Sequence, residues 1–235
     1  MYGTYDIGSK IKNDNFSISI QQENEFIYYF RECTEETFER SIMADNGKIL
    51  INPVEPVNKP KAITNHLFIH LKKPIIIAPQ NPIKVFLKFP IEAGIFLLRN
   101  KKNHLIDIFT LQKPKYTLYG DPKNGVLCRY YESDIYHTIP EADPLFEGVM
   151  QLKIINNDVG WLELTKIVFN AYGMKLFYSD DLVAMKSEIS LENSKIAETV
   201  FLNKPLQKNM KNSLEVYISK GFVQTSNSFV MEYGI

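Results

Sequence analysis

The sequence predicts an all-β protein made of two β-sandwich domains, the C-terminal one immunoglobulin-like. Apolar and polar residues alternate with a period of two in many segments, whereas helical patterns are scarce. Turn-forming residues recur at short intervals, as they do between the strands of a sandwich. The 15 Phe and 13 Tyr residues among 235 also favour sheets, because their flat side chains suit a pleated, half-buried surface.

Strands with one buried face are predicted where the alternation is clearest. The segments are residues 16–20, 83–89, 150–154 and 214–218. Residues 34–43 and 182–191 fit either a helix or a strand, and we favour strands for both.

Three further runs, residues 26–30, 74–78 and 94–98, are almost continuously apolar. Such runs predict strands that are covered on both faces. They are too short to cross a bilayer, so we expect no membrane partner. Turns are predicted at Asp45-Asn-Gly47, Asp121-Pro122, Asn124-Gly125, Asn156-Asn-Asp158 and Ser179-Asp-Asp181.

The predicted domain boundary lies in residues 139–148, which contain two prolines and three acids. We therefore expect an N-terminal β domain over residues 1–142 and an immunoglobulin-like sandwich over residues 143–235. Upstream of this boundary, the Pro-rich residues 52–60 predict an extended, polyproline-like connector.

Composition and charge limit the classes of partner. Lys plus Arg and Asp plus Glu both total 27 and no basic stripe is present, so we expect no nucleic-acid partner. Residues 1–8 lack the basic and apolar regions of a signal peptide. Cys33 and Cys128, the two cysteines, are too few for a four-thiolate zinc site and predict reduced, separate thiols. Together these features predict a cytoplasmic protein.

His66 and His70 are a candidate metal-binding pair, because imidazoles four residues apart share one face of a helix and can bind zinc. Here Leu67, Ile69 and Leu71 alternate with them, which predicts a strand and places the histidines roughly 13 Å apart. One metal ion cannot reach both at that separation. We therefore predict no metal site and no cofactor.

Cys128 and His137 are a candidate nucleophile and base. Unless a bulge intervenes, their odd separation puts them on opposite faces of a strand, so Cys128 is better explained as a small core residue. The sequence also has no Walker loop, no dinucleotide-binding glycine motif and no Gly-x-Ser-x-Gly elbow. We predict no catalytic residue.

Residues 115–136 concentrate the side chains best suited to recognition. Tyr rings offer flat apolar area with a polar tip, and Arg offers a planar fork for carboxylate or phosphate. We predict a ligand or partner surface on Tyr119, Arg129, Tyr130, Tyr131 and Tyr136. The alternative is that the tyrosines pack within a sheet and Arg129 pairs with Asp134 or Glu132.

Glu141 and Asp143 are the acids of the predicted junction. An extended backbone would place both on one face, at a spacing that suits paired carboxylates or a calcium ion. They would then serve a rival function, that of a hydrolase or carbohydrate-active enzyme with its site at the domain junction. The same rival enzyme could instead use Cys128 with His137. The alternative is an exposed, polar linker.

Five stretches carry a resemblance to a known family. They are Asn52-Pro-Val-Glu-Pro-Val57, Lys115-Tyr-Thr-Leu-Tyr-Gly120, Gly125-Val-Leu-Cys-Arg-Tyr-Tyr131, Asp143-Pro-Leu-Phe-Glu-Gly148 and Val168-Phe-Asn-Ala-Tyr-Gly-Met174. In these stretches the chain resembles the archaeal domain-of-unknown-function family 432. The resemblance spans residues 52–174 and implies an archaeal cytosolic protein, but it implies no activity, cofactor or catalytic residue.

The leading hypothesis is a non-catalytic binding or protein-interaction module. Its partner would be a protein or a small anionic ligand, with Arg129 holding the anion and the tyrosines supplying contact area. A third hypothesis is a structural subunit that forms a homo-oligomer through its sheet edges.

Overall fold

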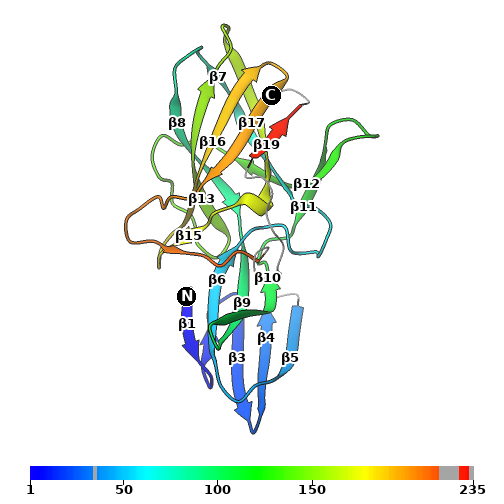
Figure 1. Cartoon of the computed structure of the whole chain (residues 1–235), viewed down its shortest axis with the longest axis vertical. Helices are drawn as coiled ribbons and strands as arrows, with labels where there is room; N and C mark the ends of the chain where they lie inside the picture. The colour runs from blue at the N-terminus through cyan, green and yellow to red at the C-terminus, as the bar shows by residue number, and fades with distance from the viewer. Residues whose placement is uncertain (34–35, 217–227, 233–235) are drawn as a thin grey trace.

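The computed structural model describes residues 1–33, 36–216 and 228–232. Strands make up most of this described part, with a short 3-10 helix, η1 (Ala171–Gly173), between two of them. The all-β prediction is therefore confirmed. The strands form four sheets, here called sheets I to IV, which lie in two pairs along the length of the molecule (Figure 1).

Sheets I and II form the part of the molecule that holds the N-terminus. Sheet I has the order β1 (Gly3–Asp6), β6 (Lys48–Val54), β9 (Glu92–Arg99) and β10 (Lys102–Phe109). Sheet II has the order β2 (Lys10–Lys12), β3 (Phe16–Glu23), β4 (Phe26–Cys33) and β5 (Glu36–Met43). Their inner faces meet where the ring of Phe16 on β3 lies 5.1 Å from the ring of Phe109 on β10.

Sheets III and IV form the other end. Sheet III has the order β11 (Lys115–Tyr119), β12 (Val126–Ser133), β7 (His66–Ile77) and β14 (Leu162–Asn170). Sheet IV has the order β18 (Lys211–Asn212), β15 (Phe177–Tyr178), β16 (Val183–Asn193), β13 (Glu147–Asn156) and β8 (Ile83–Pro90). In addition, β17 (Ile196–Leu202) pairs with β16, and β19 (Ser228–Met231) pairs with β17. The rings of Phe169 on β14 and Phe201 on β17 stack at 4.9 Å between the two sheets.

The boundary predicted at residues 142/143 is not confirmed, because strands from both sides of it share sheets. β8 pairs with β13, and β7 pairs with β14. The immunoglobulin likeness of residues 143–235 is not confirmed either. β13 pairs in parallel with β16, and β12 pairs in parallel with β7, whereas immunoglobulin sheets are antiparallel. Side chains alternate in the same way in both arrangements, so the sequence pattern could not distinguish them.

Most of the strands predicted from alternation are confirmed. β3, β8 and β13 cover the segments predicted at residues 16–20, 83–89 and 150–154. On β8, Val85 and Leu87 are buried while Lys84 beside them is exposed, as the pattern requires. β5 and β16 confirm the choice of strands over helices for residues 36–43 and 183–191; residues 34 and 35 lie outside the described part.

Residues 214–216 do not form a strand, which corrects the prediction for 214–218; residues 217 and 218 lie outside the described part. Val216 is buried instead in a cluster with Val54, Phe96 and Ile108 of sheet I. The alternation there therefore serves packing rather than strand pairing. The same cluster covers β9 on one side, so the prediction of a strand covered on both faces is confirmed for residues 94–98.

The other two apolar runs are each exposed on one side. Phe26, Tyr28 and Phe30 on β4 are between 37% and 40% exposed, and Ile76 on β7 is 65% exposed. The prediction of strands covered on both faces was therefore wrong for residues 26–30 and 74–78. The prediction of a polyproline-like connector over residues 52–60 was also wrong, because residues 52–54 complete β6 and pair with β9.

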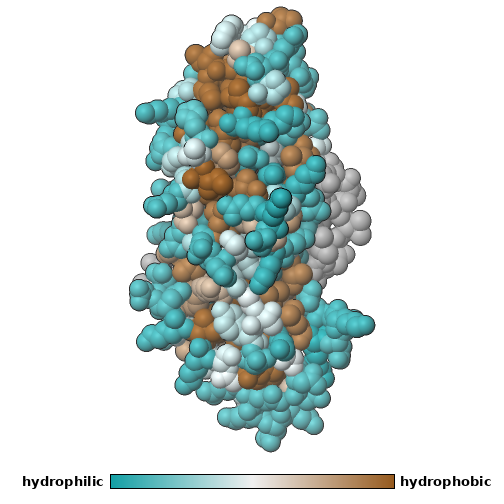
Figure 2. Space-filling model, turned by 90° about the vertical axis from the view of Figure 1, so that its left-hand side faces the viewer, coloured by the Kyte–Doolittle hydropathy of each residue, from teal (hydrophilic) through white to brown (hydrophobic). Residues whose placement is uncertain are grey.

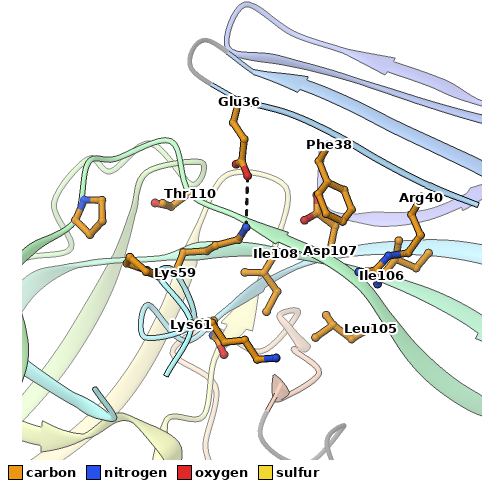
Figure 3. Close-up of a pocket in the computed structure, with 13 residues that line it drawn as sticks. Glu36, Phe38, Arg40, Lys59, Lys61, Leu105, Ile106, Asp107, Ile108 and Thr110 are labelled. Atoms are coloured by element: carbon orange, nitrogen blue, oxygen red, sulfur yellow. Dashed lines mark ion pairs between the residues drawn. The ribbon is translucent and has the colours of Figure 1, made fainter. Parts of the chain in front are cut away.

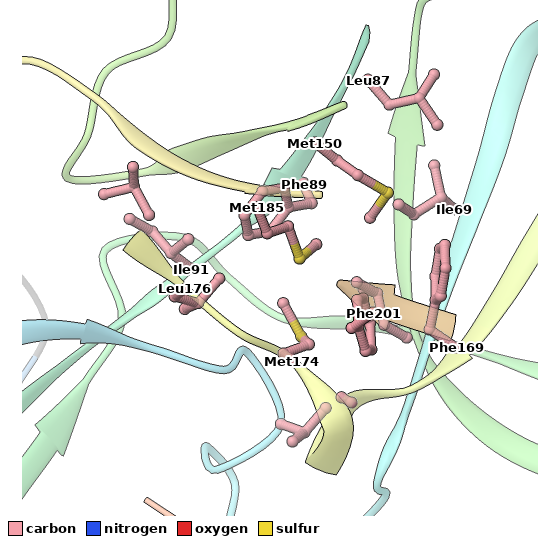
Figure 4. Close-up of a cluster of buried hydrophobic side chains, with 14 of the residues drawn as sticks. Ile69, Leu87, Phe89, Ile91, Met150, Phe169, Met174, Leu176, Met185 and Phe201 are labelled. Atoms are coloured by element: carbon pink, nitrogen blue, oxygen red, sulfur yellow. The ribbon is translucent and has the colours of Figure 1, made fainter. Parts of the chain in front are cut away.

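Three methionines meet in the core between sheets III and IV (Figure 4). Met150 and Met185 come from the neighbouring strands β13 and β16, and Met174 follows η1. All three are buried. The flexible thioether side chain fills irregular gaps, which suits a core where strands of different directions meet.

The surface is mixed in character. On the face drawn in Figure 2, apolar residues form separate patches divided by hydrophilic ones. The turn between β13 and β14 carries two of the most exposed apolar side chains, Val159 at 90% and Trp161 at 69%. Within the described ranges, no helix is long and apolar enough to cross a membrane.

Candidate functional site

A small pocket beside β12 gathers several of the predicted recognition residues. It has a volume of 290 Å³ and lies where the segment between β10 and β11 passes β12. Four cations line it, Lys72, Lys113, Lys115 and Arg129, together with Gln112 and residues 130–132. We call it the Arg129 pocket.

Arg129 reaches the interior from the middle of sheet III. It lies opposite Tyr116 on β11 and opposite Leu67 on β7, whose side chain is fully buried. Arg129 is only 2% exposed. Burial lowers the pKa of its guanidinium, and the nearby Glu92 and Tyr116 offset part of that effect.

The guanidinium of Arg129 has unused hydrogen-bond donors. Its Nε and Nη1 atoms are buried and find no acceptor among the residues that the structure describes. The ring of Tyr116 lies 5.9 Å from Cζ and contributes a cation–π contact. Asp134, one of the two acids expected to pair with Arg129, binds Lys72 at 2.8 Å instead, and Glu132 is exposed. Arg129 therefore keeps free donors beside a cationic pocket.

Glu92 is a buried acid near Arg129 that the sequence did not bring to attention. Its two carboxylate oxygens accept hydrogen bonds from the backbone N–H groups of Asn58 and Lys59, each at 3.1 Å. Burial raises the pKa of Glu92 to about 8, while the backbone bonds and Arg129 oppose the shift. The hydroxyl of Tyr116 donates to the carbonyl of Lys59 at 3.1 Å. The backbone of Lys59 thus links the acid to the ring beside Arg129.

The predicted tyrosines are only partly brought together. Tyr130 and Tyr131 line the Arg129 pocket, and the hydroxyl of Tyr131 donates to the carboxylate of Glu147. Tyr119 is 3% exposed and packs against a phenylalanine of β7. Tyr136 forms an isolated bridge to β8. These side chains do not form one continuous exposed surface, and their role in binding stays a prediction.

Glu141 and Asp143 are both exposed, in the segment between β12 and β13. They line a shallow cavity of 480 Å³ with Asp181. The carboxylate of Asp143 accepts from the backbone N–H of Leu145 at 2.9 Å, which fixes the local turn. This exposure favours the polar linker over paired catalytic carboxylates, which are usually enclosed. Over the described ranges, no group of three or more His, Cys, Asp or Glu could hold a metal ion.

Cys128 lies in an environment that suppresses its reactivity. It is fully buried, and burial raises the pKa of its thiol to about 12. The thiolate is the nucleophilic form, so this thiol is inert near neutral pH. His137 is exposed. His66 and His70 both lie on β7, and each ring contacts a different aromatic side chain, as the predicted strand implies.

The three lysines of the pocket were not predicted. Lys113 and Lys115 flank Pro114 at the start of β11, and Lys72 comes from β7, more than forty residues upstream in the chain. They converge because β11, β12 and β7 are neighbours in sheet III. Strand order was the missing information, and alternation along single strands does not contain it.

Comparison with known proteins gives a family but no activity. A family model described as Protein of unknown function (DUF432) matches residues 1–232. No curated protein and no solved structure matches the chain. This match extends well beyond residues 52–174, where the sequence resembled family 432. The predicted family is therefore confirmed. The chain belongs to the DUF432 family of proteins of unknown function.

Proposed function

We propose that this protein is a non-catalytic binding protein that holds a small oxyanion, such as a phosphate group, in the Arg129 pocket. The observation that carries the proposal is the buried guanidinium of Arg129, whose Nε and Nη1 donors have no acceptor among the described residues. Leaving a buried donor unpaired costs about 1–3 kcal/mol. Two such donors in one side chain are explained if a ligand supplies the acceptors.

The charge around the pocket supports an anion. Lys113 and Lys115 are exposed, and no described carboxylate lies within ion-pair distance of either. Lys72 is the one rim lysine that is partly neutralised, by Asp134 at 2.8 Å. Among the described residues that line the pocket, Glu132 is the single acid. Its one negative charge does not neutralise the four cations. A positive concave site of this kind concentrates anions.

The size of the pocket supports a small ligand. Its volume of 290 Å³ falls at the lower limit of ligand pockets, which span about 300–1,000 Å³. A phosphate, a sulfate or a small carboxylate fits this space, and the planar guanidinium suits all three.

We also propose a cytoplasmic location. Cys33 and Cys128 are both free thiols, which is the usual state in a reducing compartment. Fractionation of cells, followed by detection of this chain, tests the location directly.

Isothermal titration calorimetry with inorganic phosphate tests the binding proposal. We expect saturable binding at one site per chain. Arg129→Gln keeps some hydrogen bonding but removes the charge, and it should weaken binding by about tenfold or more, since hydrogen bonds to charged groups contribute about 1.5–3 kcal/mol. Arg129→Lys keeps the charge without the planar fork and should bind with intermediate affinity.

Two further variants separate binding from folding. Lys115→Gln lies on the exposed rim, so it should fold normally, weaken binding a few-fold and reduce the salt dependence. Lys84→Gln changes an exposed lysine on β8, away from the pocket, and should bind like the wild type. The proposal is wrong if folded Arg129→Gln binds phosphate as the wild type does, or if phosphate, sulfate and acetate all fail to bind the wild type saturably.

A further inference from the structure

A second and larger cleft opens between the edge strands of sheets I and II. Its volume is 670 Å³. β5, the edge of sheet II, contributes Glu36, Phe38 and Arg40, and β10, the edge of sheet I, contributes the wall opposite (Figure 3). Residues 58–61, between β6 and β7, close one end. We call this the edge cleft.

The wall from β10 is largely apolar. Leu105, Ile106 and Ile108 line the cleft, and the register of β10 shifts between Leu105 and Asp107. Such a bulge re-aims side chains at a sheet edge, which explains how consecutive residues reach the same space. Pro60 and Pro114 extend the apolar lining. An apolar body can therefore be held here.

The acids of the edge cleft already have cationic partners. Asp107 accepts from Nε of Arg31 at 2.6 Å and from the hydroxyl of Tyr29 at 3.1 Å. Glu36 binds Nη2 of Arg31 at 3.1 Å. It also binds Nζ of Lys59 at 3.6 Å, the ion pair drawn in Figure 3. Neither carboxylate therefore leaves negative charge uncompensated in the cleft.

Two cations of the edge cleft have no such partner. Across the described ranges, no carboxylate forms an ion pair with Arg40 or Lys61. Arg40 lies over the ring of Phe38, with Cζ 5.2 Å from the ring centre, so the aromatic ring supports the guanidinium from one side. The remaining edge of the guanidinium and the ammonium of Lys61 are free to meet an anion.

From this arrangement we infer that the edge cleft binds an organic anion with an apolar body. Arg40 and Lys61 hold the carboxylate, sulfonate or phosphate group, and the β10 wall holds the apolar part. The volume of 670 Å³ is within the range of about 300–1,000 Å³ that is typical of small-molecule sites. This site is separate from the Arg129 pocket, because the described lining residues of the two have no member in common.

Two fluorescent dyes test the inference, because they share one apolar body and differ in charge. 8-Anilinonaphthalene-1-sulfonate carries a sulfonate, and N-phenyl-1-naphthylamine lacks it. We expect the sulfonate to bind at one site with about tenfold higher affinity, as a charge-assisted hydrogen bond would give. The double variant Arg40→Gln/Lys61→Gln should abolish that difference while leaving the affinity for the neutral dye within about twofold, since only the anion-binding groups change.

Further variants locate the dye. Leu105→Ser should weaken both dyes by a similar factor, because it removes part of the shared apolar wall. Lys84→Gln should change neither, and Arg129→Gln should leave the sulfonate dye at wild-type affinity. Equal affinity for the two dyes, wild-type affinity in the double variant, or a loss in Arg129→Gln as large as in the double variant would each overturn the inference. Failure of the phosphate experiment would leave this result unaffected, since the two sites use different residues.

Discussion

The buried ion pair between Arg31 and Asp107 makes a specific prediction about stability. The side chains of Arg31 and Asp107 are 0% and 2% exposed, and Nε lies 2.6 Å from Oδ2. The same oxygen accepts from the hydroxyl of Tyr29 at 3.1 Å. This pair joins β4 of sheet II to β10 of sheet I, so it lies in the interface between the two sheets. Asp107→Asn removes the negative charge while keeping nearly the same shape.

Removing one partner of a buried ion pair costs about 3–5 kcal/mol, because the other charge stays buried without compensation. Two features reduce the cost here. The amide of Asn keeps one acceptor oxygen, and Glu36 remains 3.1 Å from Nη2 of Arg31. We therefore expect a loss of about 2–4 kcal/mol in the free energy of unfolding.

Urea unfolding followed by circular dichroism measures this loss. With a slope near 3 kcal/mol per molar urea, the midpoint should fall by about 1 M at unchanged slope. Glu36→Gln is the matched control, because the Glu36 side chain is 48% exposed and its removal should cost less than about 1 kcal/mol. Replacing both partners, in Arg31→Met/Asp107→Leu, should be much less harmful than Asp107→Asn alone. A loss for Asp107→Asn no larger than that for Glu36→Gln would show that the buried ion pair does not stabilise the interface between sheets I and II.

Two other predictions concern Glu92 and the packing of β13. Burial raises the pKa of Glu92 from its ordinary value of 4.5 to about 8, so the folded state holds this proton more tightly than the unfolded state does. As pH rises between these values, the Glu92 contribution should therefore destabilise the fold, by at most about 1.4 kcal/mol per pH unit. Urea unfolding at pH 5, 6.5 and 8 should show wild type losing stability relative to Glu92→Gln, and a constant difference would contradict the assignment. Separately, a Cβ at Gly148 would lie 2.3 Å from the buried ring of Phe89, whereas at Gly160 the nearest atom is 3.9 Å away. Gly148→Ala should lower the free energy of unfolding by about 1–3 kcal/mol, and Gly160→Ala by less than about 0.5 kcal/mol. Equal urea-unfolding midpoints for the two variants would show that the core around Phe89 rearranges to accept the added methyl group.

Local patterns predicted the strands well because one side of each pleat had to be buried. β8 and β13 alternate between buried and more exposed residues over 83–89 and 150–154, and both strands were placed correctly. The prediction of burial on both faces was wrong at residues 26–30. There, exposed aromatic side chains on the outer face of β4 make the sequence apolar on both sides of the strand. Residues 214–216 alternate because they pack on the outside of sheet I, and a single segment gives no sign of that.

Long-range pairing was the part that the sequence did not reveal. Parallel pairing of β13 with β16, and the sharing of sheets across residue 142, depend on which strands become neighbours. The candidate site shows the same limit. Arg129 was predicted as the residue that holds an anion, but its burial and its unpaired donors depend on its long-range neighbours, which include Tyr116 and Glu92. Glu92 itself sits in an apolar run, and its hydrogen-bond partners lie 33 and 34 residues away.

The most direct test of the account is the Nε–H resonance of Arg129 in a nitrogen-15 NMR spectrum, assigned by its loss in Arg129→Lys. Titration with inorganic phosphate should shift this signal progressively to saturation, with the dissociation constant found by calorimetry, because the oxyanion supplies the acceptor that the fold lacks. A signal that stays in place while phosphate reaches millimolar concentration would contradict the proposal that Arg129 is kept open for a ligand.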